Sequence, residues 1–281
     1  MIHPRAARTA ELYVAHLDRL VPGALAGFYL VGSVALGAYR AGRSDVDFVA
    51  VLDSEVGSAE LRRLRLLHIR SGFHTATASI RRGHSPLSGT CNGVFVRWAD
   101  LAAPVTEVTP VASHIGYKFT TAPVGSDVSP VAWKVLAERG IPIRGPEPSS
   151  LPLDPQPDLL RSWNLDNLDR YWRPWALALT RSPRAWNRLR PRWSSAYGVL
   201  GPPRLHYTIA TGDVISKDES GEYALDVFPP RWHPLIGDAL AYWRREPRRL
   251  RLSPRTRRQH TAEFVLDVIA AAQELRSAPP T

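Results

Sequence analysis

The sequence of 281 residues predicts an α/β domain followed by an all-α domain. Three observations favour this organisation. Short apolar runs typical of buried strands alternate with amphipathic helical segments in the first half, a proline-rich stretch interrupts the chain near residue 150, and apolar residues at helical spacing dominate beyond it. We therefore expect two domains, at residues 1–150 and 151–281, each long enough to bury its own core.

Helices and strands alternate along the first half. The first helix is predicted from apolar residues spaced by three and four positions, and Thr9 is its expected N-cap. Asn92-Gly93 favours a hairpin turn ahead of the third strand. In chain order, the expected elements are a helix at 8–21, strands at 27–31 and 48–52, a helix at 55–70, a strand at 94–98, a helix at 131–139 and a short strand at 141–143.

A proline-rich stretch separates the two halves. Residues 145–158 hold five prolines in fourteen residues, and proline neither donates a backbone hydrogen bond nor fits a helix interior. We expect this stretch to be a linker. Beyond it, segments 159–179, 233–245 and 261–276 carry apolar residues at helical spacing, which predicts a helical second domain.

The composition excludes several classes of protein. Hydrophobic residues make up 44% of the chain and charged residues 22%, which is typical of a folded globular protein. No apolar run approaches the ~20 residues that a bilayer-spanning helix needs, and the N-terminus lacks the apolar core of a secretory signal. The single cysteine, Cys91, excludes a disulfide framework and a thiolate metal cluster. We therefore expect a cytoplasmic protein with no membrane partner.

The chain is basic. Lys and Arg number 36 against 26 Asp and Glu, a net charge of +10, and all but three of the basic residues are arginine. A basic surface favours binding of nucleic acid or another polyanion. The excess is shared between the two halves, however, and the arginine-rich run 244–258 is more simply interpreted as a solvated connection before the last helix. Nucleic acid is therefore not the expected partner.

The chemically informative residues lie around the first two expected strands. Gly32-Ser33 directly follows the first of them, and Asp45 and Asp47 directly precede the second. Because side chains alternate along a strand, carboxylates at positions i and i+2 point to the same side, where they repel each other unless a cation lies between them. Carboxylate oxygens suit Mg²⁺, and a glycine-serine bend lets backbone N–H groups approach a phosphate. A divalent metal beside phosphates is what nucleotidyl transfer requires.

The alternative interpretation is that Asp45 and Asp47 are turn residues that open a strand, and that Gly32 and Gly37 serve a tight loop. An isolated Asp-x-Asp would favour that interpretation, because the pattern is common. Here a Gly-Ser step after a strand, a spacing of twelve residues from Ser33 to Asp45, and an apolar strand directly after Asp47 occur together. This combination favours the phosphate and metal site.

These segments resemble the Gly-Ser and Asp-x-Asp signature of the polymerase-β-type nucleotidyltransferase superfamily. Within it, the layout of the chain is similar to that of the aminoglycoside adenylyltransferases that modify streptomycin and spectinomycin. Segment 132–146 resembles the helix and Gly-Pro turn that close the family's catalytic domain, and segment 153–172 resembles the start of its helical domain. The most specific match is segment 203–218, where the residues that agree with the family's pattern are Arg204, Tyr207, Thr211, Gly212, Lys217 and Asp218.

The resemblance implies an α/β (α+β) catalytic domain with a mixed sheet, followed by an all-α domain, with the active site between them. It implies Mg²⁺-dependent transfer of AMP from ATP to a hydroxyl of a small molecule, with an aminoglycoside-type antibiotic as acceptor and antibiotic resistance as the outcome. Asp45 and Asp47 would be the catalytic residues and the metal ligands. The nucleotide would be bound by Gly32, Ser33, Ser44, Arg204, Tyr207 and Lys217.

The sequence departs from the family's pattern at the catalytic base. The family's catalytic glutamate aligns with Asn92 or Gly93, and neither can take a proton. Asp100 and Glu107 are the nearest acids that could replace it. The other interpretations are that the metal alone activates the hydroxyl, or that catalysis is slow. A catalytically weakened nucleotide-binding or regulatory homologue is therefore an alternative function.

A second departure concerns the acceptor. Where the family has acidic residues for its cationic drugs, segment 188–195 carries Arg188, Arg190 and Arg192. Such a surface repels a polycationic acceptor unless the arginines face away, so a neutral or anionic acceptor is an alternative. The net charge of +10 also suits a nucleotidyltransferase that acts on RNA or protein, which is the third alternative.

Overall fold

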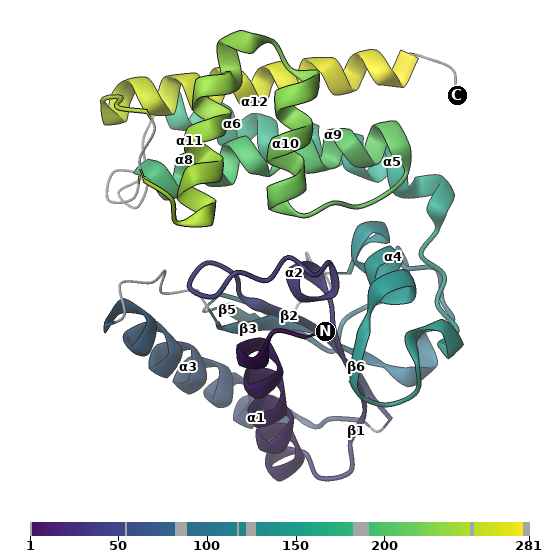
Figure 1. Cartoon of the computed structure of the whole chain (residues 1–281). Coiled ribbons are helices and arrows are strands. Elements are labelled where there is room, and N and C mark those ends of the chain that lie inside the picture. Colours follow the sequence, from purple (N-terminus) through teal and green to yellow (C-terminus); the bar gives the residue numbers. More distant parts are fainter. Residues whose placement is uncertain are drawn as a thin grey trace. The chain divides into compact units, whose positions relative to one another are not determined.

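The computed structural model divides the chain into two compact units, Met1–Pro157 and Asp158–Thr281 (Figure 1). The division falls at the end of the proline-rich stretch 145–158. The residues that the structure describes are 2–53, 55–81, 89–116, 118–121, 128–181, 191–247 and 250–277.

The first unit contains a six-stranded sheet with the strand order β5-β4-β3-β2-β1-β6. Strands β2 and β3 run parallel, and the other neighbouring pairs run antiparallel, so the predicted mixed sheet is confirmed. The elements are α1 (Pro4–Leu20), β1 (Leu25–Leu30), α2 (Gly32–Ala35), β2 (Val46–Leu52), α3 (Ser58–Arg81), β3 (Cys91–Arg97), η1 (Trp98–Asp100), β4 (Ala112–Ile115), β5 (Lys118–Thr120), α4 (Pro130–Arg139), β6 (Ile141–Arg144) and η2 (Pro148–Ser150).

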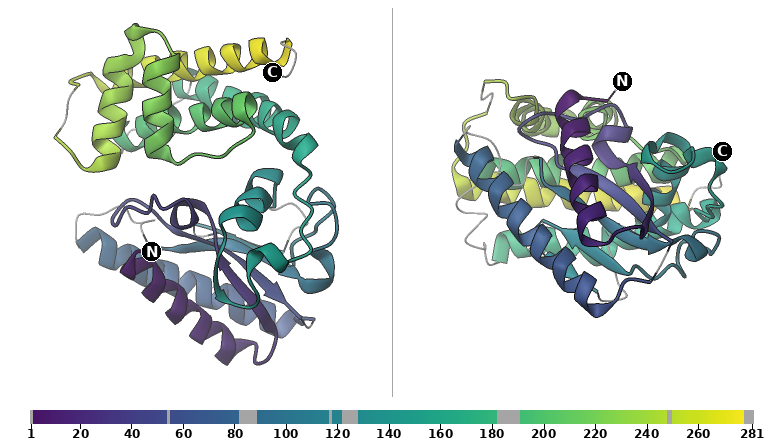
Figure 2. Two further views of the ribbon diagram at one scale, coloured as in Figure 1. Left: turned by 45° about the vertical axis from the view of Figure 1, so that its right-hand side comes forward. Right: turned by 90° about the horizontal axis from the view of Figure 1, so that it is seen from below.

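The two faces of this sheet have different roles. Helices α1 and α3 lie on one face, where Val46 and Phe48 of β2 pack in a buried cluster with Tyr13 and Leu17 of α1 and Leu64 of α3 (Figure 2). Because side chains alternate along a strand, Asp45 and Asp47 point to the opposite face. The apolar core therefore fixes the direction in which the acidic side chains point.

Two local expectations in this unit are wrong. Asn92-Gly93 does not form a hairpin turn, because both residues lie inside β3, which pairs in parallel with β2. Gly93 is needed there, since a Cβ at this position would lie 2.9 Å from the Phe48 carbonyl carbon on the neighbouring strand. Thr9 is not an N-cap, because the helix already begins at Pro4, and the His3 side chain accepts a hydrogen bond from the Arg5 N–H.

The second unit is helical, as predicted. Helix α12 is shared by its two apolar clusters: Phe264 and Val268 pack in one, and Val265 and Ile269 pack in the other. None of the described helices of the chain has both the length and the apolar character needed to cross a bilayer. The elements are α5 (Pro157–Asn167), η3 (Leu168–Trp172), α6 (Arg173–Arg181), α8 (Pro191–Leu200), α9 (Pro202–Thr211), α10 (Lys217–Val227), η4 (Pro230–Trp232), α11 (His233–Arg244) and α12 (Pro254–Ser277).

A buried ion pair joins α11 to α12. The Arg257 Nη1 and Asp238 Oδ2 atoms are 2.5 Å apart, and the side chains are only 3% and 1% exposed. The same two residues bind the backbone of Leu250, which donates to Asp238 and accepts from Arg257. The arginine-rich run 244–258 is therefore not a wholly solvated connection, because Arg257 lies in the core and Arg244 pairs with Asp218.

We predict that Asp238→Asn lowers the free energy of unfolding by about 3–5 kcal/mol, because it leaves the Arg257 charge buried without a carboxylate. Asp166→Asn is the matched control, since Asp166 pairs with Arg170 at 3.6 Å and both side chains are largely exposed. We expect this control to lose less than about 1 kcal/mol. Urea unfolding followed by circular dichroism measures both, and equal losses would contradict the prediction.

Candidate active site

The bend after β1 lies directly beside β2. Gly32 begins the short helix α2 with a φ of +57°, a backbone conformation that favours glycine. The preceding residue, Val31, donates its N–H to the Asp47 carbonyl oxygen at 3.0 Å. The Gly-Ser segment is thereby attached to the strand that carries the two aspartates.

The Asp47 carboxylate packs against Gly32. A Cβ atom at Gly32 would lie 2.9 Å from Asp47 Cγ and closer still to Oδ2. No other residue fits there without displacing the carboxylate, so glycine is required both by its φ and by this contact. The sequence predicted that the acidic pair faces the bend, and the structure places Asp47 in this position.

Asp45 is held by Asn92 of the neighbouring strand. The Asn92 Nδ2 atom donates to Asp45 Oδ2 at 2.5 Å, and Asn92 Oδ1 accepts from the Gly116 N–H at 2.9 Å. In the parallel pairing of β2 with β3, Asn92 is the register partner of Asp47. Asp45, Asp47 and Asn92 therefore lie on one face of the sheet, and the Asn92 amide is oriented by a donor on one side and an acceptor on the other.

The negative charge of this face affects the residue behind it. Burial raises the pKa of the Cys91 thiol, and the charges of Asp47 and Asp45 add to that increase.

Among the described residues, no group of three or more His, Cys, Asp or Glu side chains could hold a metal ion. A metal here would have two carboxylate ligands, and this suits Mg²⁺, which commonly keeps water and substrate phosphates as its other ligands.

Ser33 and Ser44 differ in what their hydroxyls contact. The Ser33 Oγ atom is buried and has no hydrogen-bond partner among the described residues, so a phosphate oxygen at the bend would satisfy it. Ser44 is 2% exposed, and its Oγ accepts from the Arg40 N–H at 3.0 Å. Ser44 thus shapes the loop before Asp45, and its contact to the nucleotide stays a prediction.

The two acids considered as replacement bases do not lie near Asn92. Asn92 is at the N-terminal end of β3, whereas Asp100 follows its C-terminal end and pairs with Arg97. At the rise of a strand, residues 92 and 97 are roughly 16 Å apart. Glu107 lies in the loop beyond Asp100, where its N–H donates to the Pro104 carbonyl. Neither acid substitutes for a base at residue 92.

In the second unit, the structure brings Arg204 and Lys217 to adjacent helix N-termini. Arg204 lies in the first turn of α9, and its Nε donates to the Ile215 carbonyl at 2.9 Å. Lys217 is the first residue of α10, which begins with a capping box formed by Ser216 and Glu219. Tyr207 lies three residues after Arg204 on α9, with its ring nearly perpendicular to the ring of Tyr223.

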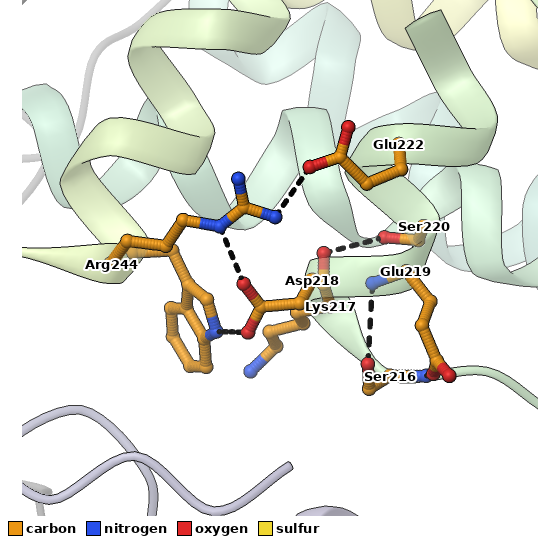
Figure 3. A network of polar contacts seen from close by, with 8 residues as sticks. Ser216, Lys217, Asp218, Glu219, Ser220, Glu222 and Arg244 are labelled. Carbon is orange, nitrogen blue, oxygen red and sulfur yellow. Dashed lines mark hydrogen bonds and ion pairs between the residues drawn. The ribbon is translucent and has the colours of Figure 1, made fainter. Parts of the chain in front are cut away.

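Trp243 contacts Lys217 and was not singled out from the sequence. The Lys217 Nζ atom lies 4.5 Å from the centre of the Trp243 ring, and Trp243 Nε1 donates to Asp218. Asp218 also accepts from Arg244 Nε at 2.9 Å, and Arg244 binds Glu222 in turn (Figure 3). Asp218 therefore positions the indole that lies beside the Lys217 ammonium. The spacing of Asp218 and Trp243, 25 residues apart on different helices, gave no local signal for this contact.

Arg192 faces the interior of its unit. Its Nη2 atom lies 3.5 Å from Asp238 Oδ1, and its guanidinium lies over the Tyr242 ring at 5.2 Å. This arginine does not belong to an outward basic wall. Arg188 and Arg190, the other two arginines of that expected wall, lie outside the described residues.

Comparison with known proteins gives matches in both units. Residues 14–72 match the family model "Nucleotidyltransferase domain", and residues 178–269 match the model "Aminoglycoside adenylyltransferase, C-terminal domain". Among solved structures, the spectinomycin adenyltransferase AAD(9) from Enterococcus faecialis, with ATP and spectinomycin, is similar at a TM-score of 0.68 and 14% identity, over 94% of this chain and 98% of that one. The chain thus combines a nucleotidyltransferase domain with a C-terminal domain of the aminoglycoside adenylyltransferase type.

The two family models cover different candidate residues. The nucleotidyltransferase match contains Gly32, Ser33, Asp45 and Asp47, and the adenylyltransferase match contains Arg204, Tyr207 and Lys217. At 14% identity, the likeness to AAD(9) shows that the two chains share a fold. No curated protein matches the chain.

We predict that Gly32→Ala weakens ATP binding in the presence of Mg²⁺ at least about tenfold, because the new methyl group displaces the Asp47 carboxylate. Gly37→Ala is the matched control. Gly37 has a similar φ of +67°, but nothing lies within 4 Å of a Cβ at that position. Both variants carry about 1 kcal/mol of backbone strain. Isothermal titration calorimetry measures the affinities, and equal weakening would show that the carboxylate contact is unimportant.

Proposed function

We propose that the protein transfers AMP from ATP to a hydroxyl of a small, aminoglycoside-type molecule, with Mg²⁺ held by Asp45 and Asp47. The observation that carries the proposal is the packing of the Asp47 carboxylate against Gly32, beside Asp45 and the unpartnered Ser33 hydroxyl. The similar protein AAD(9) was solved with ATP and spectinomycin, which supports ATP as donor and a small molecule as acceptor. We place the reaction in the cytoplasm, where ATP is available and a lone cysteine stays reduced.

In the proposed reaction, the acceptor oxygen forms a bond to the α-phosphorus of ATP, and the bond from that phosphorus to the β-phosphate oxygen breaks. Pyrophosphate leaves, and the acceptor hydroxyl loses its proton. Bound Mg²⁺ supplies positive charge against the phosphate oxygens. Asp45 and Asp47 hold that ion, and the Ser33 hydroxyl donates to a phosphate oxygen.

The cationic residues of the second unit complete the proposed set of nucleotide ligands. Arg204 binds phosphate through two parallel N–H groups, whereas Lys217 offers a point charge. The Trp243 ring holds the Lys217 ammonium in place, since a cation beside an indole face is attracted by it. We assign Tyr207 to the same nucleotide-binding set because it lies one turn from Arg204 on α9.

Asn92 cannot take the proton of the acceptor. Its amide orients Asp45 through the 2.5 Å hydrogen bond instead. In the proposed reaction the proton passes to solvent, and the rate lacks the ~10²–10⁴-fold contribution of a general base. The same observation supports a second candidate function, a nucleotide-binding regulatory homologue, which would bind ATP with Mg²⁺ and turn over no acceptor.

An aminoglycoside-type acceptor is compatible with the inward orientation of Arg192. Because Arg192 pairs inward with Asp238, it does not repel a cationic drug at the surface. Spectinomycin and streptomycin are therefore the first acceptors to test. If RNA were the acceptor instead, its affinity for the protein would fall steeply as salt is added.

We predict that Asp47→Asn lowers pyrophosphate release from ATP, Mg²⁺ and spectinomycin or streptomycin by about 10³-fold, because charge stabilisation by a bound metal is worth several kcal/mol. Asp53→Asn is the matched control, since Asp53 is an exposed residue just beyond the other end of β2. It should retain full activity. ATP binding without turnover on any acceptor would favour the regulatory homologue instead.

We predict that Asn92→Glu raises the rate of transfer by about 10²-fold near pH 8, because it places a proton acceptor beside Asp45. Asn92→Gln, which has the same length but no basic oxygen, should give no increase. Steady-state kcat across pH 6–9 measures the effect. A rate in Asn92→Glu that stays at the level of Asn92→Gln would show that residue 92 does not face the attacking hydroxyl.

A further inference from the structure

A groove lies between α1 and α3, on the face of the sheet opposite Asp45 and Asp47. Its volume is about 1070 Å³, and its floor reaches Cys91 and His114 of β3 and β4. Cys91 precedes Asn92 in the same strand, and neighbouring residues of a strand point to opposite faces. The groove and the acidic site are therefore on the two sides of the same sheet. In the right-hand view of Figure 2, α1 and α3 diverge toward the N-terminal end of α1.

Leucines make part of the groove apolar. Its walls include Leu12 and Leu20 from α1, and Leu66 and Leu67 from α3. Leu12 and Leu66 are 44% and 46% exposed, and they lie beside the buried Tyr13 of α1 and the half-buried Leu67 of α3. Exposed leucines on two facing helices lose contact with water when an apolar body lies between them.

The rims of the groove carry positive charge. Arginine lines it from both helices, and among the described residues that line it there is no aspartate or glutamate. Burial lowers the pKa of His114 at the floor of the groove, so this histidine adds no charge near neutral pH. Within the described part of the chain, none of the rim arginines has a carboxylate within ion-pair distance. The rim arginines are Arg5, Arg8 and Arg19 of α1, and Arg63 and Arg70 of α3.

The combination selects one chemical class of ligand. Like charges gathered around an apolar groove repel one another, and an anion between them removes that repulsion. Arginine binds phosphate and carboxylate oxygens in pairs, whereas the leucines bind hydrocarbon. The volume corresponds to the upper end of small-molecule sites, and a concave groove between helices does not match the flat surface of a bilayer. We propose that the groove between α1 and α3 binds a single amphiphilic anion, with an apolar chain on the leucines and a phosphate or carboxylate head on the rim arginines.

The first experiment uses dodecyl phosphate below its critical micelle concentration, titrated into the full-length protein by isothermal titration calorimetry. We expect saturable binding with one molecule per chain. Inorganic phosphate and dodecyltrimethylammonium should each bind at least about tenfold more weakly, because one lacks the chain and the other has the wrong charge. Equal binding of the ammonium compound overturns the proposal. Binding to phosphatidylglycerol vesicles without binding of monomeric dodecyl phosphate also overturns it, and would identify a membrane-facing surface.

The second experiment compares two double variants with the same change in net charge. Arg8→Glu with Arg70→Glu alters both rims of the groove and should weaken dodecyl phosphate binding at least about tenfold. Arg62→Glu with Arg65→Glu alters exposed arginines of α3 that are not among the groove residues, and should change the affinity less than about twofold. Equal weakening by the two pairs overturns the proposal, because it would reflect net charge alone.

Two readouts keep this test separate from the proposed reaction. Both double variants should keep the circular dichroism spectrum of the parent protein, since all four arginines are exposed. Both should also keep the parent affinity for ATP with Mg²⁺, because α1 and α3 pack on the face of the sheet away from Asp45 and Asp47. Loss of ATP binding in the groove variant alone would overturn the assignment of two separate sites.

Discussion

The alternation of side chains along β2 and β3 is the constraint on which the first unit depends. Val46 and Phe48 point into the core with α1, and this forces Asp45 and Asp47 to the other face. The parallel register then sets Asn92 beside Asp47. A shift of one residue in this pairing would bury both acids under α1 and expose Phe48. Burial of the apolar set therefore keeps the acidic set in place, and the stability of the core and the geometry of the site have one cause.

Glycine takes part in this arrangement at two points where backbone and side chain approach closely. Gly32 leaves room for the Asp47 carboxylate, and Gly93 leaves room for the carbonyl group of Phe48 on the adjacent strand. The positive φ of Gly32 also turns the chain after β1, and this turn places Ser33 at the bend. In the second unit, the equivalent precision comes from polar contacts, since Asp218 positions both Trp243 and Arg244 around Lys217.

The sequence was sufficient to predict the parts of the fold that have a local signature. Apolar runs marked β1 and β2, and the helix expected at 131–139 is α4, which ends before Gly140. The short strands β4 and β5 were not predicted, because three or four residues carry too little periodicity to be distinguished from a loop. Asn92-Gly93 was misassigned to a turn because its environment is set by Phe48, which is distant in sequence.

In the candidate site, too, only the residues with a local sequence signature could be predicted. Gly32, Ser33, Asp45 and Asp47 belong to a compact motif, and the structure brings Asp47 against Gly32 as that motif predicted. The hydrogen bond from Asn92 to Asp45 joins residues 47 positions apart, so spacing alone did not indicate it.

The chain has a single cysteine, and the fold places its thiol at the floor of the groove between α1 and α3. Cys91 is 8% exposed, and burial keeps the thiol protonated, so it reacts slowly with alkylating reagents in the folded protein. Faster modification by a maleimide therefore reports opening of the layer that α1 and α3 form on the sheet. The natural sequence thus contains a chemical probe for opening of this layer, without any engineered label.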